Sequence, residues 1–225
     1  MSLDTEVLPN IYAFRPNRES LGGTAYALVR RDRHSSTFAN LLVDCPAATP
    51  QVCDRLAQLG GVRWIALTHR TAIGSPAAST SSVAKIAKRF DCDVVVQEQE
   101  AYLLPHLRLL TFGDRLDLAP DIQFIWTPGH TPGSSCVFYA DLGGVLFSGR
   151  HLLPDAGGRL NPLRQAKTFH WPRQLRNVGK LLDVIPAPAP AWICPGANTG
   201  ELQGKKVMDA GRDRLLAAAS EAYTA

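Results

Sequence analysis

Short runs rich in β-branched and aromatic residues dominate the first 45 residues of the chain. Turn clusters such as Arg15-Pro16-Asn17 and Gly22-Gly23 separate these runs. This alternation is typical of short strands joined by tight turns. We expect strands at residues 7–14, 24–31 and 38–44. The pattern predicts an antiparallel meander at the N-terminus.

Helical spacing then alternates with short apolar runs. A helix is predicted at 51–59, a buried strand at 62–68 and a further strand at 92–97. A second helix is expected to begin at Ser75-Pro76, because serine caps helix N-termini and proline suits the first helical position. The apolar face of this helix consists of Val83, Ile86, Ala87 and Phe90.

The second half of the chain repeats the alternation of strands and helices. Strands are predicted at 108–111, 115–118, 122–126 and 192–194, a hairpin at 136–139 and 145–148, and helices at 173–185 and 201–223. Strands followed twice by helices indicate two sheets packed on each other with helices outside. We therefore predict an α/β fold, a four-layer αβ/βα sandwich. With no fixed-period repeat and no linker between two cores, residues 1–225 are expected to form a single domain.

Composition narrows the class of protein. With 225 residues, 45% apolar and 20% charged, the chain is typical of globular proteins and unlike collagen-like, disordered or disulfide-scaffold chains. Its five scattered cysteines form no CxxC pair and are predicted to be buried thiols in a reducing cytoplasm. No secretory signal is expected, because the first ten residues hold two acids and no apolar run after a basic start. No membrane association is expected either, since the uncharged stretch 184–197 is too short and proline-rich to span a bilayer as a helix.

The charge is unevenly distributed, although the net value is only +4. Residues 61–90 hold five bases and no acid, whereas residues 91–121 hold seven acids and two bases. Residues 122–200 return to seven bases against three acids. Solvated surface is the usual fate of such charges, but the two basic blocks also contain the candidate site described next.

Polar residues and glycines stand at the ends of several predicted strands. Asp44 follows one apolar run and His69 another, and a loop punctuated by glycine and proline surrounds His130. The segments of this kind are Leu42-Val43-Asp44-Cys45-Pro46, Leu67-Thr68-His69, the TPGHTPGS loop at 127–134, GVLFSG at 144–149 and Cys194-Pro195-Gly196. In this order and spacing they resemble the metallo-β-lactamase superfamily over nearly the whole chain.

The resemblance implies an αβ/βα sandwich that binds two zinc or iron ions at one edge. In such proteins a metal-bound hydroxide attacks an ester, amide, thioester or phosphodiester. The chemistry requires imidazoles and carboxylates that converge on each cation, with one position left open for a water whose pKa falls to about 7.

Only two of the seven ligand positions implied by the resemblance remain, His69 and His130. The other five are occupied by Thr71, Ile73, Gly74, Arg150 and Ala197. Arg150 stands where the bridging aspartate is expected. A guanidinium roughly 4 Å from a divalent ion would repel it by about 8 kcal/mol at an effective dielectric constant near 20. We therefore predict that the binuclear hydrolytic centre is absent and expect no cofactor.

The functional hypothesis is a site whose charge is reversed. The candidate anion-binding residues are His69, Arg70, His130, Arg150 and His151. Further basic side chains follow at Arg164, Lys167, His170 and Arg173. Arginine suits carboxylates and phosphates because its planar fork donates two parallel hydrogen bonds. The chain is predicted to be a non-hydrolytic protein whose cationic pocket binds an anionic small molecule or a protein partner.

Three alternatives stay open. The two histidines could be neutral and structural, with Arg150 paired to Asp44 or Asp155. The chain could instead be a hydrolase with one zinc or iron held by His69, His130 and a third residue, for which His151 and His170 are candidates. His151 adjoins Arg150 and would point the other way in an extended stretch. Nucleic-acid binding is disfavoured by the modest net charge and the lack of a basic motif interleaved with aromatic residues.

Overall fold

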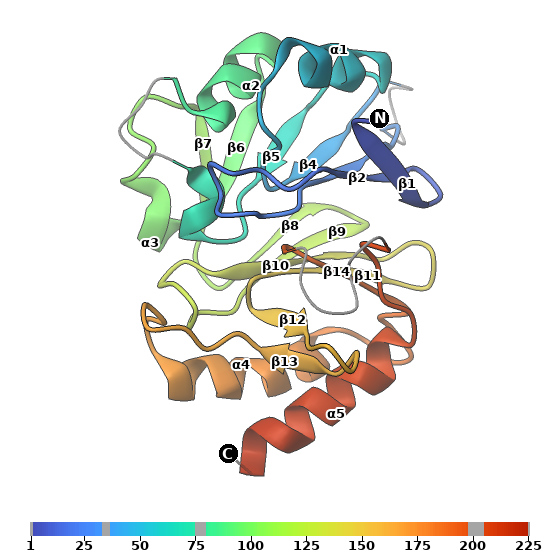
Figure 1. Cartoon of the computed structure of the whole chain (residues 1–225), viewed down its shortest axis with the longest axis vertical. Coiled ribbons are helices and arrows are strands. Elements are labelled where there is room, and N and C mark those ends of the chain that lie inside the picture. Colours follow the sequence, from blue (N-terminus) through green and yellow to red (C-terminus); the bar gives the residue numbers. More distant parts are fainter. Residues whose placement is uncertain (1, 33–36, 75–79, 198–204, 225) are drawn as a thin grey trace. The chain divides into compact units, whose positions relative to one another are not determined.

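The structure is a computed structural model that describes residues 2–32, 37–74, 80–197 and 205–224 (Figure 1). The chain forms two compact units, Met1–Thr111 and Phe112–Ala225. Each unit contains its own sheet and its own helices, so the mixed α/β class and the two predicted sheets are confirmed. The organisation of residues 1–225 as a single domain stays a prediction.

The first sheet has seven strands in chain order. They are β1 (Asp4–Leu8), β2 (Ile11–Phe14), β3 (Tyr26–Leu28), β4 (Leu41–Val43), β5 (Trp64–Ala66), β6 (Asp93–Gln97) and β7 (Leu109–Phe112), and the chain passes into the second unit within β7. The first four strands are antiparallel, which confirms the predicted meander, and β4, β5 and β6 are parallel.

The segment 7–14 was predicted from its apolar pattern to be one strand. In the structure it contains the end of β1, a turn and β2, which together form a hairpin. Leu8 pairs with Ile11 across Pro9 and Asn10, and Asn10 has a φ of 63°. Asparagine tolerates this left-handed conformation better than most residues, and proline cannot donate to a sheet. Local turn chemistry therefore overrides the apolar run.

The described residues of the first unit also form the helices α1 (Pro50–Gln58), η1 (Arg70–Ile73, a 3₁₀ helix), α2 (Ser82–Phe90) and α3 (Glu98–Ala101). The predicted helix start at Ser75-Pro76 lies outside the described residues. Helix α2 begins at Ser82, where the Oγ of Ser81 accepts a hydrogen bond from the amide of Ala84. Val83, Ile86 and Ala87 are buried as predicted, and Phe90 is half-buried.

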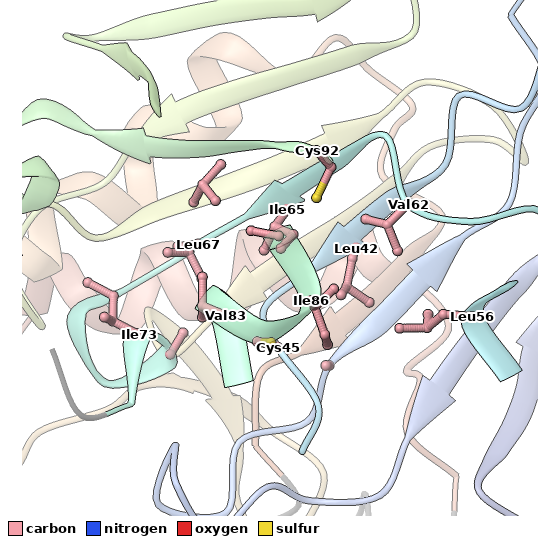
Figure 2. Packing of buried hydrophobic residues seen from close by; sticks show 14 of the residues in the cluster. Leu42, Cys45, Leu56, Val62, Ile65, Leu67, Ile73, Val83, Ile86 and Cys92 are labelled. Carbon is pink, nitrogen blue, oxygen red and sulfur yellow. The ribbon is translucent and has the colours of Figure 1, made fainter. Parts of the chain in front are cut away.

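The core of the first unit lies between the parallel strands and these helices. Figure 2 shows Leu42 of β4 and Ile65 of β5 among Leu56 of α1 and Val83 and Ile86 of α2. Successive strand residues point to opposite faces, so alternate strand positions supply this cluster. Its apolar side chains bury hydrocarbon from both kinds of element, which is the main force that holds helices to the sheet.

The second sheet has the strand order β14-β11-β10-β9-β8. Its strands are β8 (Arg115–Ala119), β9 (Ile122–Trp126), β10 (Ser135–Tyr139), β11 (Val145–Gly149) and β14 (Trp192–Pro195). The predicted hairpin is confirmed, since Val137 pairs with Phe147. A separate hairpin of β12 (Leu152–Pro154) and β13 (Leu160–Pro162) was not predicted, because three-residue strands give too short a pattern.

Helices α4 (Trp171–Val184) and α5 (Gly211–Thr224) pack on one face of this sheet (Figure 1). Val178 and Leu181 of α4 and Leu215 of α5 share a buried cluster with sheet residues such as Leu146. The predicted helix at 201–223 is too long. Residues 201–204 lie outside the described part, and 205–210 are not helical because Met208 exchanges two backbone hydrogen bonds with Ile193 of β14.

All five cysteines are free thiols, and four of them are buried, while Cys53 is half-buried. Across the described ranges, no helix has the length and apolar character needed to cross a membrane.

Candidate functional site

Asp44, Thr68 and His69 form a buried hydrogen-bonded chain at the ends of β4 and β5. The backbone N–H and the hydroxyl of Thr68 both lie 2.9 Å from Asp44 Oδ1, and the same hydroxyl is 2.9 Å from His69 Nδ1. A carboxylate only accepts, so Thr68 uses its single O–H proton toward Asp44. His69 Nδ1–H then donates to Thr68, and in the neutral ring Nε2 carries the lone pair.

Asp44 is expected to stabilise the first unit strongly. Asp44→Ala removes the acceptor of two Thr68 donors and places alanine at a φ of 56°, so we expect a loss of about 3 kcal/mol in the free energy of unfolding. Asp44→Asn keeps one acceptor oxygen and a residue that tolerates this backbone, and should lose less. Urea denaturation measures both variants. Equal stability of the two would contradict this role of the carboxylate.

Arg70 is engaged elsewhere in the first unit. Its Nε lies 3.8 Å from Oε1 of Glu100 in α3, and this carboxylate is buried. A buried carboxylate needs a nearby cation to offset its lost hydration. Arg70 therefore offsets the charge of Glu100. The role of Arg70 in a cationic pocket stays a prediction.

The segment after His69 packs as part of the core. Ile73, at the position of a metal-ligating carboxylate in the family pattern, belongs to the buried cluster of the first unit. Gly74 ends η1 with a φ of 77° and donates its N–H to the carbonyl of Thr71. The local sequence here builds hydrocarbon packing and a turn.

In the second unit, the TPGHTPGS loop closes on itself and on the start of α4. Thr127 N–H donates to the carbonyl of Ser134, and Thr131 N–H donates to the hydroxyl of Ser134. The carbonyl of His130 accepts from Phe169 N–H, and that of Gly129 accepts from His170 N–H. These bonds fix His130, whose side chain is buried.

Two amide side chains of α4 hold the loops that carry His130 and Arg150. Asn177 Nδ2 donates to the carbonyl of Pro128 at 2.7 Å. Gln174 Nε2 donates to the carbonyls of His151 and Leu163, at 3.2 and 3.1 Å. Sequence reasoning missed both residues. The available signal was a pair of amides three positions apart on the apolar side of a helix, where uncompensated polar groups are rare.

The glycine of the Cys194-Pro195-Gly196 segment permits a close backbone approach. Gly196 N–H donates to the carbonyl of Gly149 at 2.7 Å, and a Cβ at Gly196 would lie 2.9 Å from Gly149 Cα. The end of β14 is thereby held against the end of β11, where Arg150 begins a turn. Ala197, at the last ligand position of the family pattern, is buried.

Arg150 and His151 lie in this turn after β11, with His151 N–H donating to the carbonyl of Ser148. The extended geometry assumed for these two residues is therefore wrong, and both side chains are buried, Arg150 being 5% exposed. Asp155, one of the two carboxylates considered as a partner for Arg150, instead pairs with Arg159 at 3.0 Å.

His130 lies close enough to both Arg150 and His151 for their charges to affect one another's pKa values. Burial, and next the positive charge of Arg150, lower the pKa of His130 to about 4. Burial, and next His130, lower the pKa of His151 to about 3, against a smaller opposite effect of the Asn177 backbone. Both imidazoles are therefore neutral at pH 7. The structure places a guanidinium beside two uncharged rings.

The basic residues before and at the start of α4 have local roles. Arg164 stacks over Trp171 and Arg173 over Trp126 as cation–π pairs, with 5.2 and 4.6 Å between the guanidinium carbon and the ring centroid. The Nδ1 of His170 caps α4 by accepting from Arg173 N–H. Lys167 is exposed.

Two positions of the family's ligand pattern carry side chains that are not metal ligands, Ile73 and Arg150. Ile73 is part of the hydrocarbon core of the first unit, and Arg150, where the family pattern has the bridging aspartate, is a buried side chain of the second unit. Considering only residues that the structure describes, no three His, Cys, Asp or Glu side chains gather as metal ligands do.

Comparisons with known proteins find relatives at the level of structure. No protein-family profile and no curated protein matches the chain. Among solved structures, ETHE1 from Myxococcus xanthus is 17% identical, with 92% of this chain and 84% of that chain covered and a TM-score of 0.60. DIM-1 metallo-β-lactamase, exposed to ceftazidime, is 16% identical, with 98% of this chain and 96% of that chain covered and a TM-score of 0.65.

A B3 metallo-β-lactamase with an active-site glutamic acid is 15% identical over 100% of this chain and 88% of that chain, with a TM-score of 0.64. Identities this low establish architecture and not activity. The resemblance drawn from the loop motifs is thus confirmed for the fold, and the chain has the metallo-β-lactamase fold.

Proposed function

We propose that this protein is a non-hydrolytic binding protein of the metallo-β-lactamase fold, in which Arg150 binds the carboxylate or phosphate of an anionic small molecule. One observation carries the proposal. Arg150 is a buried cation at the position of the bridging carboxylate, and it lies beside His130 and His151, which are neutral.

Electrostatics favours an anion over a metal ion at this position. The charge of Arg150 already disfavours a proton on His130, and a divalent cation would meet the same repulsion with twice the charge. An anion meets the opposite field. The guanidinium can donate two parallel hydrogen bonds to it, and a neutral imidazole can donate one more.

Burial increases the effect of each of these groups. A charged hydrogen bond in a site of low dielectric is stronger than one in water, provided that its partner is well placed. The turn that carries Arg150 and the loop that carries His130 are both held by α4, through Gln174 and Asn177. The donors are thus positioned before an anion arrives, which lowers the entropic cost of binding.

Calorimetric titration with inorganic phosphate and with citrate tests the proposal. We expect binding to the unmodified protein, and an affinity about 10- to 100-fold lower for Arg150→Gln, as expected when a charged hydrogen bond is lost. Arg159→Gln is the matched control, because Arg159 is an exposed arginine of the same unit that pairs with Asp155. Arg150→Lys shows whether charge alone suffices. Equal affinities for Arg150→Gln and the control would refute the proposal.

The rival function is a hydrolase with one metal ion held by His69, His130 and a third residue. Elemental analysis of protein expressed with added zinc and iron, together with assays on a thioester and a β-lactam, separates the two. We expect substoichiometric metal and no turnover. One zinc or iron per chain with turnover would overturn the binding proposal and establish the rival.

A further inference from the structure

A groove of about 450 Å³ lies in the first unit, between the second half of α2 and the segment that leads into β7. Its lining residues all belong to the range 84–108, so it is separate in sequence from every residue of the candidate site. The groove combines uncharged lining residues with a rim of charged and polar side chains.

The floor is built from small and apolar side chains. Ala84 and Ala87 are three positions apart on α2 and so lie on the same side of the helix. Cys92 is buried, and burial raises its pKa to about 11, so its thiol is uncharged at neutral pH. Leu107 adds a half-buried hydrocarbon side chain. Two alanines where longer side chains would fill the space leave the depression open.

The rim carries Lys88, His106 and Arg108 against one acid, Asp91. Arg108 is fixed in place, because its Nη1 lies 3.1 Å from Asp91 Oδ1 and its Nε contacts Asp93. The charges of Arg108, Asp91 and Asp93 therefore offset one another, which leaves Lys88 as the cation of the rim that matters for a ligand. Lys88 is exposed and forms no ion pair with any described residue, so its ammonium is available to a ligand.

We propose that this groove binds a small amphipathic anion, with a carboxylate at Lys88 and an aliphatic chain on the floor formed by Ala84, Ala87, Cys92 and Leu107. The charge of Lys88 selects the sign of the head group, since a cation attracts anions. The uncharged floor favours hydrocarbon, and each added methylene that it covers should strengthen binding about fourfold. Arg108, held by Asp91 and Asp93, lines the same groove.

Titration of the ¹⁵N-labelled full-length protein with butyrate, hexanoate and octanoate, followed by NMR, tests the site. We expect saturable shifts of amides in the range 84–108 and an affinity that rises with chain length. Octylammonium, which has the same chain and the opposite charge, should bind at least tenfold more weakly than octanoate. Shifts centred outside this range, or equal affinities for the three carboxylates, would overturn the proposal.

Variants separate the contributions of the rim and the floor. Lys88→Gln should weaken octanoate binding about tenfold, whereas Lys85→Gln, at an exposed lysine of the same helix outside the groove, should leave it unchanged. Ala84→Leu should block the floor and lower affinity at least tenfold. Circular dichroism checks that each variant folds, and Lys88→Gln remains decisive if Ala84→Leu does not. The amide shifts of residues 84–108 report on this groove, whereas a carboxylate bound at Arg150 would shift amides near residue 150, so this site can fail or stand independently of the proposed function.

Discussion

Replacement of Gly129 by alanine is expected to lower the free energy of unfolding by about 3 kcal/mol or more. A Cβ at residue 129 would lie 2.6 Å from the backbone N of Gln174 and closer still to its Cα and Cβ. Backbone atoms of a helix cannot rotate away as the end of a flexible side chain can. The loop or α4 would have to shift, and overpacking of this kind costs about 1–3 kcal/mol before backbone strain is added. Gly129 has a φ of 151°, which an L residue rarely adopts.

The consequence extends beyond one contact. A shift between residue 129 and α4 disturbs the bonds of His170 N–H to Gly129 and of Asn177 to Pro128, which hold the His130 loop. Thermal and urea unfolding measure the effect. Gly157→Ala is the matched control in the same unit, because its Cβ would meet only Asp155 Oδ1, at 3.4 Å. If the two variants were equally stable, the close packing of the loop on α4 would be wrong.

Acidification is expected to destabilise the protein between about pH 6.5 and pH 4. The pKa of His130 is lowered to about 4 and that of His151 to about 3, from an ordinary 6.5. In this window the unfolded chain binds more protons than the folded chain, so the free energy of unfolding falls as the pH falls. Each histidine contributes about 1.4 kcal/mol per pH unit. At pH 5 this gives a loss of about 2 kcal/mol per histidine relative to pH 7.

Denaturant unfolding at half-unit steps from pH 7.5 to pH 4 measures this slope. His151→Gln should flatten the acid limb by about half, whatever its effect on stability at pH 7, because one of the two depressed imidazoles is gone. His106→Gln serves as the control, since His106 is exposed to solvent in the native protein. An unchanged slope in His151→Gln would show that this ring is not held neutral by burial.

Secondary structure was predictable where a single element carried its own pattern. The spacing of Val83, Ile86 and Ala87 identified α2, and the turn at 141–144 between two apolar runs identified the β10–β11 hairpin. The errors fall where a distant partner decides. Met208 leaves the predicted last helix because it pairs with Ile193, and no local pattern encodes that partner.

For the candidate site, too, the sequence predicted some features and missed others. Thr71, Ile73, Gly74, Arg150 and Ala197 were recognisable from the motifs alone as departures from a ligand pattern, since residue identity decides which side chains can bind a metal. The motifs did not reveal which groups these residues meet. Arg70 was grouped with Arg150, yet the structure pairs it with buried Glu100 on α3, 30 positions along the chain.

The sequence by itself determined the fold class and showed which positions of the family's ligand pattern carry other residues. Periodicity and turn residues depend on local interactions, and the loop motifs depend on residue identity, so both can be recognised without coordinates. Only the tertiary structure decided that Arg150 and His151 form a buried turn, that Gln174 and Asn177 hold the site loops, and that Lys88 borders a groove. Burial and hydrogen-bond partners depend on which segments pack together, and pKa values follow from both.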